Sequence, residues 1–243
     1  MTPTPISIEL SPCEKTIDGL LQRSGYLLQT YRSIEALQVL MEALGIAQTA
    51  DIQWQVRSAV YRNLGEVHVQ LGHIDEGIAF FIKSFDIIED ENGKAAAAGN
   101  IAGYYLRKGE SKLALEYAEK ALEIATAPEL KAMPYQIQGG VAILEGDWQK
   151  AIQLMNKAAE FAEQSHSLTD LAMIIMDISA IFMKMGKPET ALSEIYRAER
   201  YVKECRNLDL YRRCAIRRAK ILFMMGKDEE AKKLVLALDD QEN

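Results

Sequence analysis

A phrase built around one glycine recurs five times in this 243-residue chain, and it limits the available folds more than any other feature. In each copy a polar turn follows the glycine, and a small residue stands five positions after it. The glycines are Gly72, Gly109, Gly146, Gly186 and Gly226, at intervals of 37, 37, 40 and 40 residues. A period of this length is typical of stacked supersecondary units, whereas an ordinary helical bundle needs no fixed spacing.

Each part of the phrase has a physical role in a helix-turn-helix unit. A glycine just past a helix adopts, at little cost, the left-handed conformation that ends the helix. Acidic residues such as Asp75 and Glu76 follow it, where the dipole of the next helix favours negative charge. Pro188 falls in a first helical turn, where its missing N–H is harmless. Long stretches without proline or glycine separate the phrases, which favours helices over strands.

Small and bulky residues form a second regular pattern around the phrase. The small positions of the helix before each glycine are Gly65, Ala102, Gly139, Ser179 and Ala219. Those of the helix after it are Gly77, Ala114, Ala151, Ala191 and Ala231, followed by bulky residues at Phe81, Met155, Ile195 and Val235. This pattern resembles the tetratricopeptide repeat family, although Gln138 and Arg218 stand at usually apolar positions. The resemblance implies an all-α fold, a right-handed α-solenoid of about six helix-turn-helix repeats.

The resemblance also sets the expected domain boundaries. A degenerate first repeat fits residues 17–50, with Tyr31 at the position of the turn glycine. Pro3, Pro5 and Pro12 predict an extended N-terminal arm over residues 1–16, because proline disfavours helix at the residue before it. We expect one solenoid domain over residues 17–243, because no linker interrupts it.

The composition and charge of the chain bear on its expected cellular compartment and on the classes of partner it can bind. The net charge of −7 and the pI of about 5.2 disfavour nucleic acid and anionic membranes as partners. The N-terminus has no signal-peptide pattern, and no apolar run approaches the roughly 20 residues that cross a bilayer. Cys13, Cys205 and Cys214 form no CxxC pair, which favours a reducing compartment. We therefore expect a cytoplasmic protein.

No residue pattern predicts catalysis, a metal site or a cofactor. The sequence has no phosphate-binding loop, dinucleotide fingerprint, serine-hydrolase elbow or zinc-protease motif. Glu163 and His166 are three residues apart as in di-iron bundles, but those bundles need a second such motif and further carboxylates. We expect a protein that is not an enzyme and takes no cofactor.

The resemblance implies that the first helix of each pair lines a concave groove that holds a peptide. The positions expected to contact the peptide are Arg62, Asn63, Glu66, Asn100, Arg107, Gln136, Met173, Met176, Asp177, Arg213, Arg217 and Lys220. In the family, an asparagine at the sites of Asn63 and Asn100 holds the backbone of an extended peptide. A solvated asparagine on the helix surface is the alternative. The family's clamp for a C-terminal carboxylate is disfavoured, because Glu66, Met133 and Ile137 stand at its positions.

Two further features bear on this groove. The methionines either line an adaptable apolar pocket or fill the core, and we favour the groove for Met176 and the core for Met183. Residues 196–220 carry a net charge of +6, which leaves −13 for the rest of the chain. Such a basic cluster either pairs with acidic neighbours or receives an acidic peptide.

The sequence therefore predicts a scaffold or adaptor that holds a protein or peptide segment, acidic or mixed in charge. The alternative is a sensor domain that responds to a short signalling peptide, as relatives with long repeats do. We also expect a homodimer formed through the C-terminal repeat, because Leu234, Val235 and Leu238 form an apolar stripe with no later helix to cover it. The alternative for the stripe is packing onto its own repeat.

Overall fold

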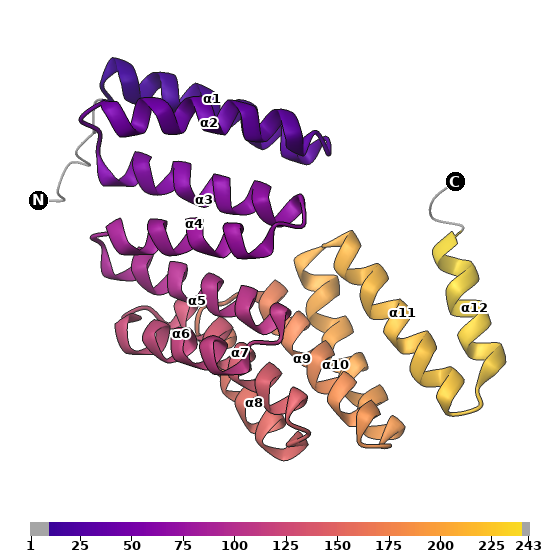
Figure 1. The fold of residues 1–243 in the computed structure, drawn as a ribbon. Helices are drawn as coiled ribbons and strands as arrows, with labels where there is room; N and C mark the ends of the chain where they lie inside the picture. The colour runs from indigo at the N-terminus through magenta and orange to yellow at the C-terminus, as the bar shows by residue number, and fades with distance from the viewer. Residues whose placement is uncertain (1–9, 240–243) are drawn as a thin grey trace, which may run out of the picture. The chain divides into compact units, whose positions relative to one another are not determined.

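The computed structural model describes residues 10–239, which form twelve α-helices and one 3-10 turn without any strand (Figure 1). The elements are α1 (Pro12–Gln29), α2 (Ser33–Thr49), α3 (Trp54–Gln70), α4 (Ile74–Ile87), α5 (Glu91–Lys108), α6 (Ser111–Ile124), η1 (Pro128–Leu130), α7 (Ala132–Leu144), α8 (Trp148–Gln164), α9 (Leu168–Lys184), α10 (Pro188–Cys205), α11 (Leu208–Met224) and α12 (Asp228–Asp239). Short turns join them into six consecutive pairs. The predicted all-α fold and the number of helix pairs are confirmed.

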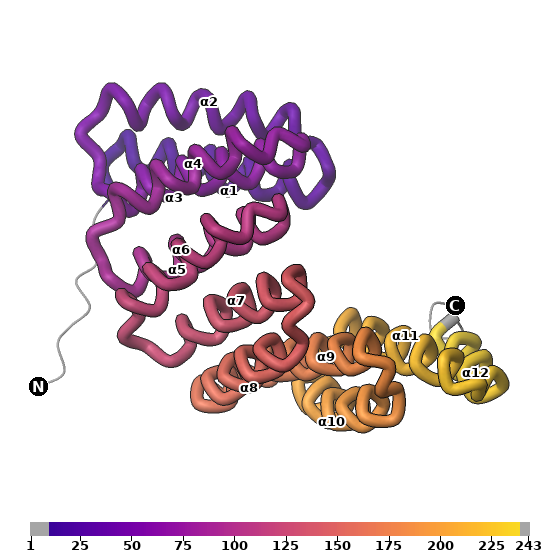
Figure 2. Tube along the Cα trace, turned by 60° about the horizontal axis from the view of Figure 1, so that its bottom comes forward, coloured from indigo at the N-terminus to yellow at the C-terminus, as the bar shows by residue number. Residues whose placement is uncertain are grey.

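The helices group into two compact units, and the boundary between Tyr104 and Tyr105 falls inside α5. In the first unit α1 packs on α2 and α3 packs on α4, while α3 also contacts both α1 and α2. In the second unit α7 packs on α8, α9 on α10 and α11 on α12, and α8–α9 and α10–α11 contacts join successive pairs (Figure 2). The single domain expected over residues 17–243 stays a prediction.

The turns within all six pairs share one hydrogen-bonding pattern. Each turn residue has a positive φ, which is 84° at Gly72, between 69° and 82° at the other four phrase glycines, and 59° at Tyr31. The next residue donates its N–H to the carbonyl five positions earlier, as His73 does to His68 and Arg32 does to Leu27, both at 2.8 Å. These bonds satisfy carbonyls that a helix end leaves unpaired. Tyr31 therefore takes the place of the turn glycine, as the sequence predicts.

Small residues allow the two helices of a pair to approach closely. A Cβ atom on Gly65 would lie 2.7 Å from the ring of Phe81, and one on Gly77 would lie 2.6 Å from Val69. Both distances are far below van der Waals contact, so no larger residue fits between α3 and α4 without a shift. In the fifth pair Ser179 has the same position, and its hydroxyl donates to the carbonyl of Ala191 at 2.7 Å. The second small-residue pattern thus fixes the spacing within pairs.

The structure corrects the predicted N-terminal arm. The helix α1 begins at Pro12, because Ser11 and Glu14 form a capping box and proline is tolerated in a first turn. Residues 12–16 are therefore helical rather than extended, and residues 1–9 lie outside the described part of the chain. The carboxylate of Glu14 is buried, and it accepts from the backbone N–H of Ser11 at 2.7 Å and of Gln53 at 2.9 Å. It thereby ties the start of α1 to the start of α3.

The last helix divides its apolar residues between core and solvent. Leu234 packs against the core of the second unit, whereas Val235 and Leu236 are 40% and 62% exposed. The packing of Leu234 favours the alternative prediction, in which the apolar stripe packs on its own repeat. The homodimer stays a prediction, and the side chain to test for it is Leu236 rather than Leu234.

We expect Glu14→Gln to lower the melting temperature at pH 7. The backbone N–H groups of Gln53 and Ser11 lower the pKa of Glu14 from 4.5, so the ionised form is favoured in the folded protein. Its stabilisation is present above pH 4.5 and is lost as the pH falls through the lowered pKa of the folded state. The melting temperatures of the two proteins should therefore converge as the pH is lowered below 4.5 and through the folded-state pKa. The exposed Glu42→Gln is the control, and an equal effect of both variants would contradict the role of Glu14.

For self-association we expect light scattering at micromolar concentration to give a dimer mass for the intact protein and a monomer mass for Leu236→Glu. An introduced charge cannot be buried in an apolar interface without a large desolvation cost. The matched control is Leu144→Glu on α7, because Leu144 is 60% exposed and so offers the same change at a similar exposure. A monomer mass for the unmodified protein would rule the dimer out.

Candidate functional site

A pocket of about 230 Å³ lies in the first unit, and side chains of α3, α4 and α5 line it. The helix α3 contributes side chains one turn apart, and α5 faces them with small residues and one asparagine. The residues that line this pocket, which we call the anchor pocket, are Trp54, Ser58, Arg62, Phe81, Ser84, Ile88, Gly93, Ala96, Ala97 and Asn100. It lies on the first helices of two successive pairs, where the sequence predicts a binding groove.

The interior of the anchor pocket offers no free hydroxyl donor, although two serines line it. Ser84 donates its hydroxyl to the carbonyl of Ser58 at 3.1 Å, and Ser58 donates its own to the carbonyl of Gln55 at 3.0 Å. The ring of Phe81 stacks on Tyr104 with centroids 4.5 Å apart and is only 5% exposed. The hydroxyl donors are therefore already used, and the wall presents mainly carbon.

Two of the four predicted contact residues in this unit line the anchor pocket. Arg62 and Asn100 are exposed at it, and neither makes an ion pair or a side-chain hydrogen bond with residues 10–239. Asn63 does not line it, since its amide donates to the carbonyl of Ala59 in its own helix at 2.8 Å. Glu66 lies one turn beyond Arg62; partial burial raises the pKa of this carboxyl, and Arg62 lowers it in part. The structure thus separates Asn63 and Glu66 from the pocket.

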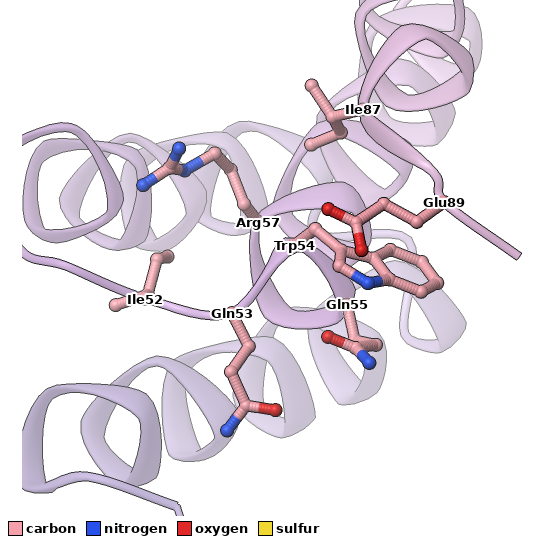
Figure 3. A pocket seen from close by; sticks show the side chains of 7 residues that line it. All are labelled: Ile52, Gln53, Trp54, Gln55, Arg57, Ile87 and Glu89. Atoms are coloured by element: carbon pink, nitrogen blue, oxygen red, sulfur yellow. The ribbon is translucent and has the colours of Figure 1, made fainter.

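Trp54 also borders a second, more open pocket of about 500 Å³ at the start of α3. Its lining consists of Ile52, Gln53, Trp54, Gln55, Arg57, Ile87 and Glu89 (Figure 3). The guanidinium of Arg57 points away from the carboxylate of Glu89, which lies beside the indole of Trp54. The charged groups do not converge on one point, so this second pocket lacks the geometry of a charge-selective site.

In the second unit the predicted contact residues Asp177 and Arg217 bind each other. The guanidinium of Arg217 on α11 lies 3.2 Å from Asp177 on α9 and also donates to the carbonyl of Met176. Burial raises the pKa of Asp177, while Arg217 and Arg213 lower it. Arg217 is thus engaged within the fold, as the alternative interpretation of the basic cluster predicts.

Other basic residues of α11 differ in how firmly they are held. Arg218 pairs with Glu199 on α10 at 2.6 Å, and both side chains are largely buried, which explains a charged residue at a usually apolar position. Arg213 lies 4.0 Å from Asp209, and both of these side chains are exposed. Lys220 is exposed and makes no ion pair within the described part of the chain. Arg213 and Lys220 are therefore the basic residues that remain accessible on this helix.

The assignment of Met176 to the groove is wrong. Its side chain is 1% exposed and belongs to the core of the second unit. The cause is the position of α9, which contacts α8, α10 and α11 and so buries more of its surface than an amphipathic pattern suggests. Met173 and Met183 both pack partly against the same core. Of the remaining predicted contact residues, Arg107 is exposed and Gln136 is partly exposed.

The sequence-based prediction does not include Trp54, Ser58 and Ala97 as lining residues, and it assigns Phe81 only to packing. A signal was present, because Trp54, Ser58 and Arg62 are four residues apart and share one helical face. On α5 the tract Gly93–Asn100 is small at nearly every position, so its sequence does not mark which side faces α3. What the pattern lacks is the identity of the helix that lies opposite.

The described residues offer little of the usual chemistry of an active site. Within residues 10–239 no three histidine, cysteine or acidic side chains gather in a way that could hold a metal ion. Burial raises the pKa of the Cys214 thiol to about 11, so this thiol stays protonated at neutral pH. In the same part of the chain, no helix combines the length and the hydrophobicity needed to cross a membrane.

Residues 56–127 match the tetratricopeptide repeat family model, and this stretch contains the anchor pocket residues that follow Trp54. Residues 56–127 are therefore similar to tetratricopeptide repeats. The family resemblance drawn from the glycine phrase is therefore confirmed. No curated protein sequence matches the chain.

Several solved structures share the tetratricopeptide fold of this chain at low identity. A signal transduction ATPase with a tetratricopeptide repeat sensor from Pyrococcus horikoshii has a TM-score of 0.74 at 15% identity, over 95% of this chain and 37% of that one. Aspartyl phosphate phosphatase F from Bacillus subtilis has a TM-score of 0.68 at 13% identity, over 96% and 74%. A Rap protein complexed with competence and sporulation factor has a TM-score of 0.65 at 14% identity, over 93% and 76%. At such identities the likeness shows the fold.

We expect a double-mutant cycle of Arg218→Ala and Glu199→Ala to give a coupling energy of about 1–2 kcal/mol in urea unfolding, because the pair is short and largely buried. The control cycle of Arg213→Ala and Asp209→Ala should give less than about 0.5 kcal/mol, because both side chains are exposed. Equal couplings in the two cycles would mean that Arg213 is as firmly held as Arg218 and is not available to a partner.

Proposed function

We propose that this tetratricopeptide repeat protein is a scaffold or adaptor that binds a polypeptide segment of a partner along the first helices of its pairs. The anchor pocket carries the proposal. It is a preformed hollow lined by α3, α4 and α5, and at its rim the side chains of Arg62 and Asn100 make no ion pair or side-chain hydrogen bond with the described residues. An asparagine amide both donates and accepts, which suits a peptide unit. The arginine suits a carboxylate.

The second unit supports an acidic or mixed segment. Arg213, Ile216 and Lys220 lie three or four residues apart on α11, and all three are exposed. They form a face on which an apolar residue, itself 45% exposed, stands between two cations. A peptide that alternates acidic and apolar residues complements such a face.

A non-catalytic role in the cytoplasm is part of the proposal. The only hydroxyls that line the anchor pocket belong to Ser58 and Ser84, and both donate to backbone carbonyls instead of to a general base. Cys13 is an exposed free thiol, which suits a reducing compartment.

A second candidate is a sensor domain that responds to a short signalling peptide. It is favoured by two of the similar structures, one a Rap protein complexed with competence and sporulation factor and the other a signal transduction ATPase with a tetratricopeptide repeat sensor. If this candidate holds, peptide binding should change the small-angle scattering profile of the chain. A scaffold should show the same profile with and without peptide.

To test binding, the protein is immobilised and a random peptide library is selected on it, followed by affinity measurements on the enriched peptides. We expect Arg62→Ala with Asn100→Ala, or Arg213→Glu with Lys220→Glu, to weaken binding about tenfold, because each pair removes charge-assisted or backbone hydrogen bonds. The contribution of Arg213 and Lys220 to the affinity should also shrink as the salt concentration rises, because exposed charges are screened.

The control double variant is Lys112→Glu with Lys150→Glu, which makes the same charge change at exposed positions of α6 and α8. It should leave the affinity within about twofold of the unmodified protein. The proposal fails if no peptide is enriched, or if enriched peptides bind all the variants equally.

A further inference from the structure

We infer that the anchor pocket accepts one aromatic side chain of the bound segment, and that Arg62 selects an acidic residue next to it. This inference rests on the proposed peptide-binding function and names the chemistry of the segment. It concerns the first unit alone.

The volume of the anchor pocket fits a single ring. At about 230 Å³ it exceeds the cavity of about 150 Å³ that holds a benzene molecule in a protein core. It is smaller than the roughly 300–1,000 Å³ of pockets that enclose whole drug-sized ligands. One large side chain therefore fills it, while the rest of a ligand must lie outside, as the backbone of a peptide would.

The wall favours an aromatic occupant over a charged or strongly polar one. Phe81 and Trp54 place two aromatic rings at the pocket, and the hydroxyls of Ser58 and Ser84 are already donated to carbonyls. Aromatic rings associate through stacked or edge-to-face contacts. A cation placed there would lose its hydration beside the guanidinium of Arg62, and no carboxylate lines the pocket to pair with it.

The rim adds a preference for the neighbouring residue. Arg62 is exposed beside the pocket and comes within 4.0 Å of no acidic oxygen among the described residues, since Glu66 on the next turn interacts with it only at longer range. A carboxylate next to the aromatic residue would therefore meet an available guanidinium. Asn100 on the facing helix can hold the peptide unit between the two side chains.

The room for the ring comes from three small residues of α5. Gly93, Ala96 and Ala97 line the pocket opposite Trp54 and Phe81, and a larger side chain at Ala97 would occupy the space itself. Ala97→Leu therefore removes the site while keeping a good helix former in place. The matched control is Ala79→Leu, which adds the same atoms at an exposed position of α4.

The first experiment titrates the ¹⁵N-labelled full chain with N-acetyl-phenylalanine amide and compares N-acetyl-alanine amide. We expect the phenylalanine probe to bind at least tenfold more tightly, with nuclear Overhauser effects between its ring protons and the methyl group of Ala97. Ala97→Leu should weaken its binding at least tenfold, and Ala79→Leu should leave it unchanged. The Overhauser contact is read in the unmodified protein, so the test does not depend on the stability of a variant.

The second experiment compares acetyl-Asp-Phe-amide with acetyl-Lys-Phe-amide. The aspartate probe should bind about two- to fivefold more tightly, the range expected of an exposed ion pair, and Arg62→Ala should abolish the difference. Equal affinity of the phenylalanine and alanine probes, or a ring that contacts residues other than those of the anchor pocket, would overturn the aromatic assignment. If peptides from the library bind but tolerate Ala97→Leu, the inference fails and the proposed function stands. If no peptide is enriched at all, the proposed function fails as well.

Discussion

The hydrogen bond from the residue after each turn to the carbonyl five positions earlier is the interaction on which the helix pairs depend. It forms only when the intervening residue has a positive φ, and five of the six turns meet this condition with glycine. The turn length is thereby fixed, and so is the rotational setting of the second helix against the first. The first pair reaches the same geometry with Tyr31, which is 93% exposed and so meets no steric opposition from neighbours.

Given such turns, the size of the residues at the crossing points decides how near the helices lie. Gly65 and Gly77 bring α3 against α4 until the ring of Phe81 touches the α3 backbone. The same ring then forms part of the wall of the anchor pocket, and small residues on α5 leave the space above it open. Packing within the second pair and the wall of the anchor pocket thus share the side chain of Phe81.

The basic residues of α11 in the second unit divide into those bound within the fold and those that remain exposed. Arg217 forms an ion pair with Asp177, and Arg218 forms one with Glu199. Both positive charges are therefore neutralised in contacts between helices. Arg213 and Lys220 stay accessible on the same helix, next to the exposed Ile216. The net charge of +6 on residues 196–220 is therefore larger than the charge accessible to a ligand. The accessible charge on the exposed face of α11 is still positive.

The sequence by itself determined the repeat, the helix pairs, the turn positions and the place of Arg62 and Asn100 on the helix faces at which the anchor pocket lies, because these follow from local periodicity and from the backbone needs of glycine. It misplaced the start of α1, where a capping box overrides the proline signal. Only the tertiary structure decided that Met176 is core, that Arg217 is engaged by Asp177, and that Trp54, Phe81 and Ala97 meet around one pocket. Those facts depend on which helices lie opposite one another, and the periodic pattern of one helix marks its buried face without identifying the helix that covers it.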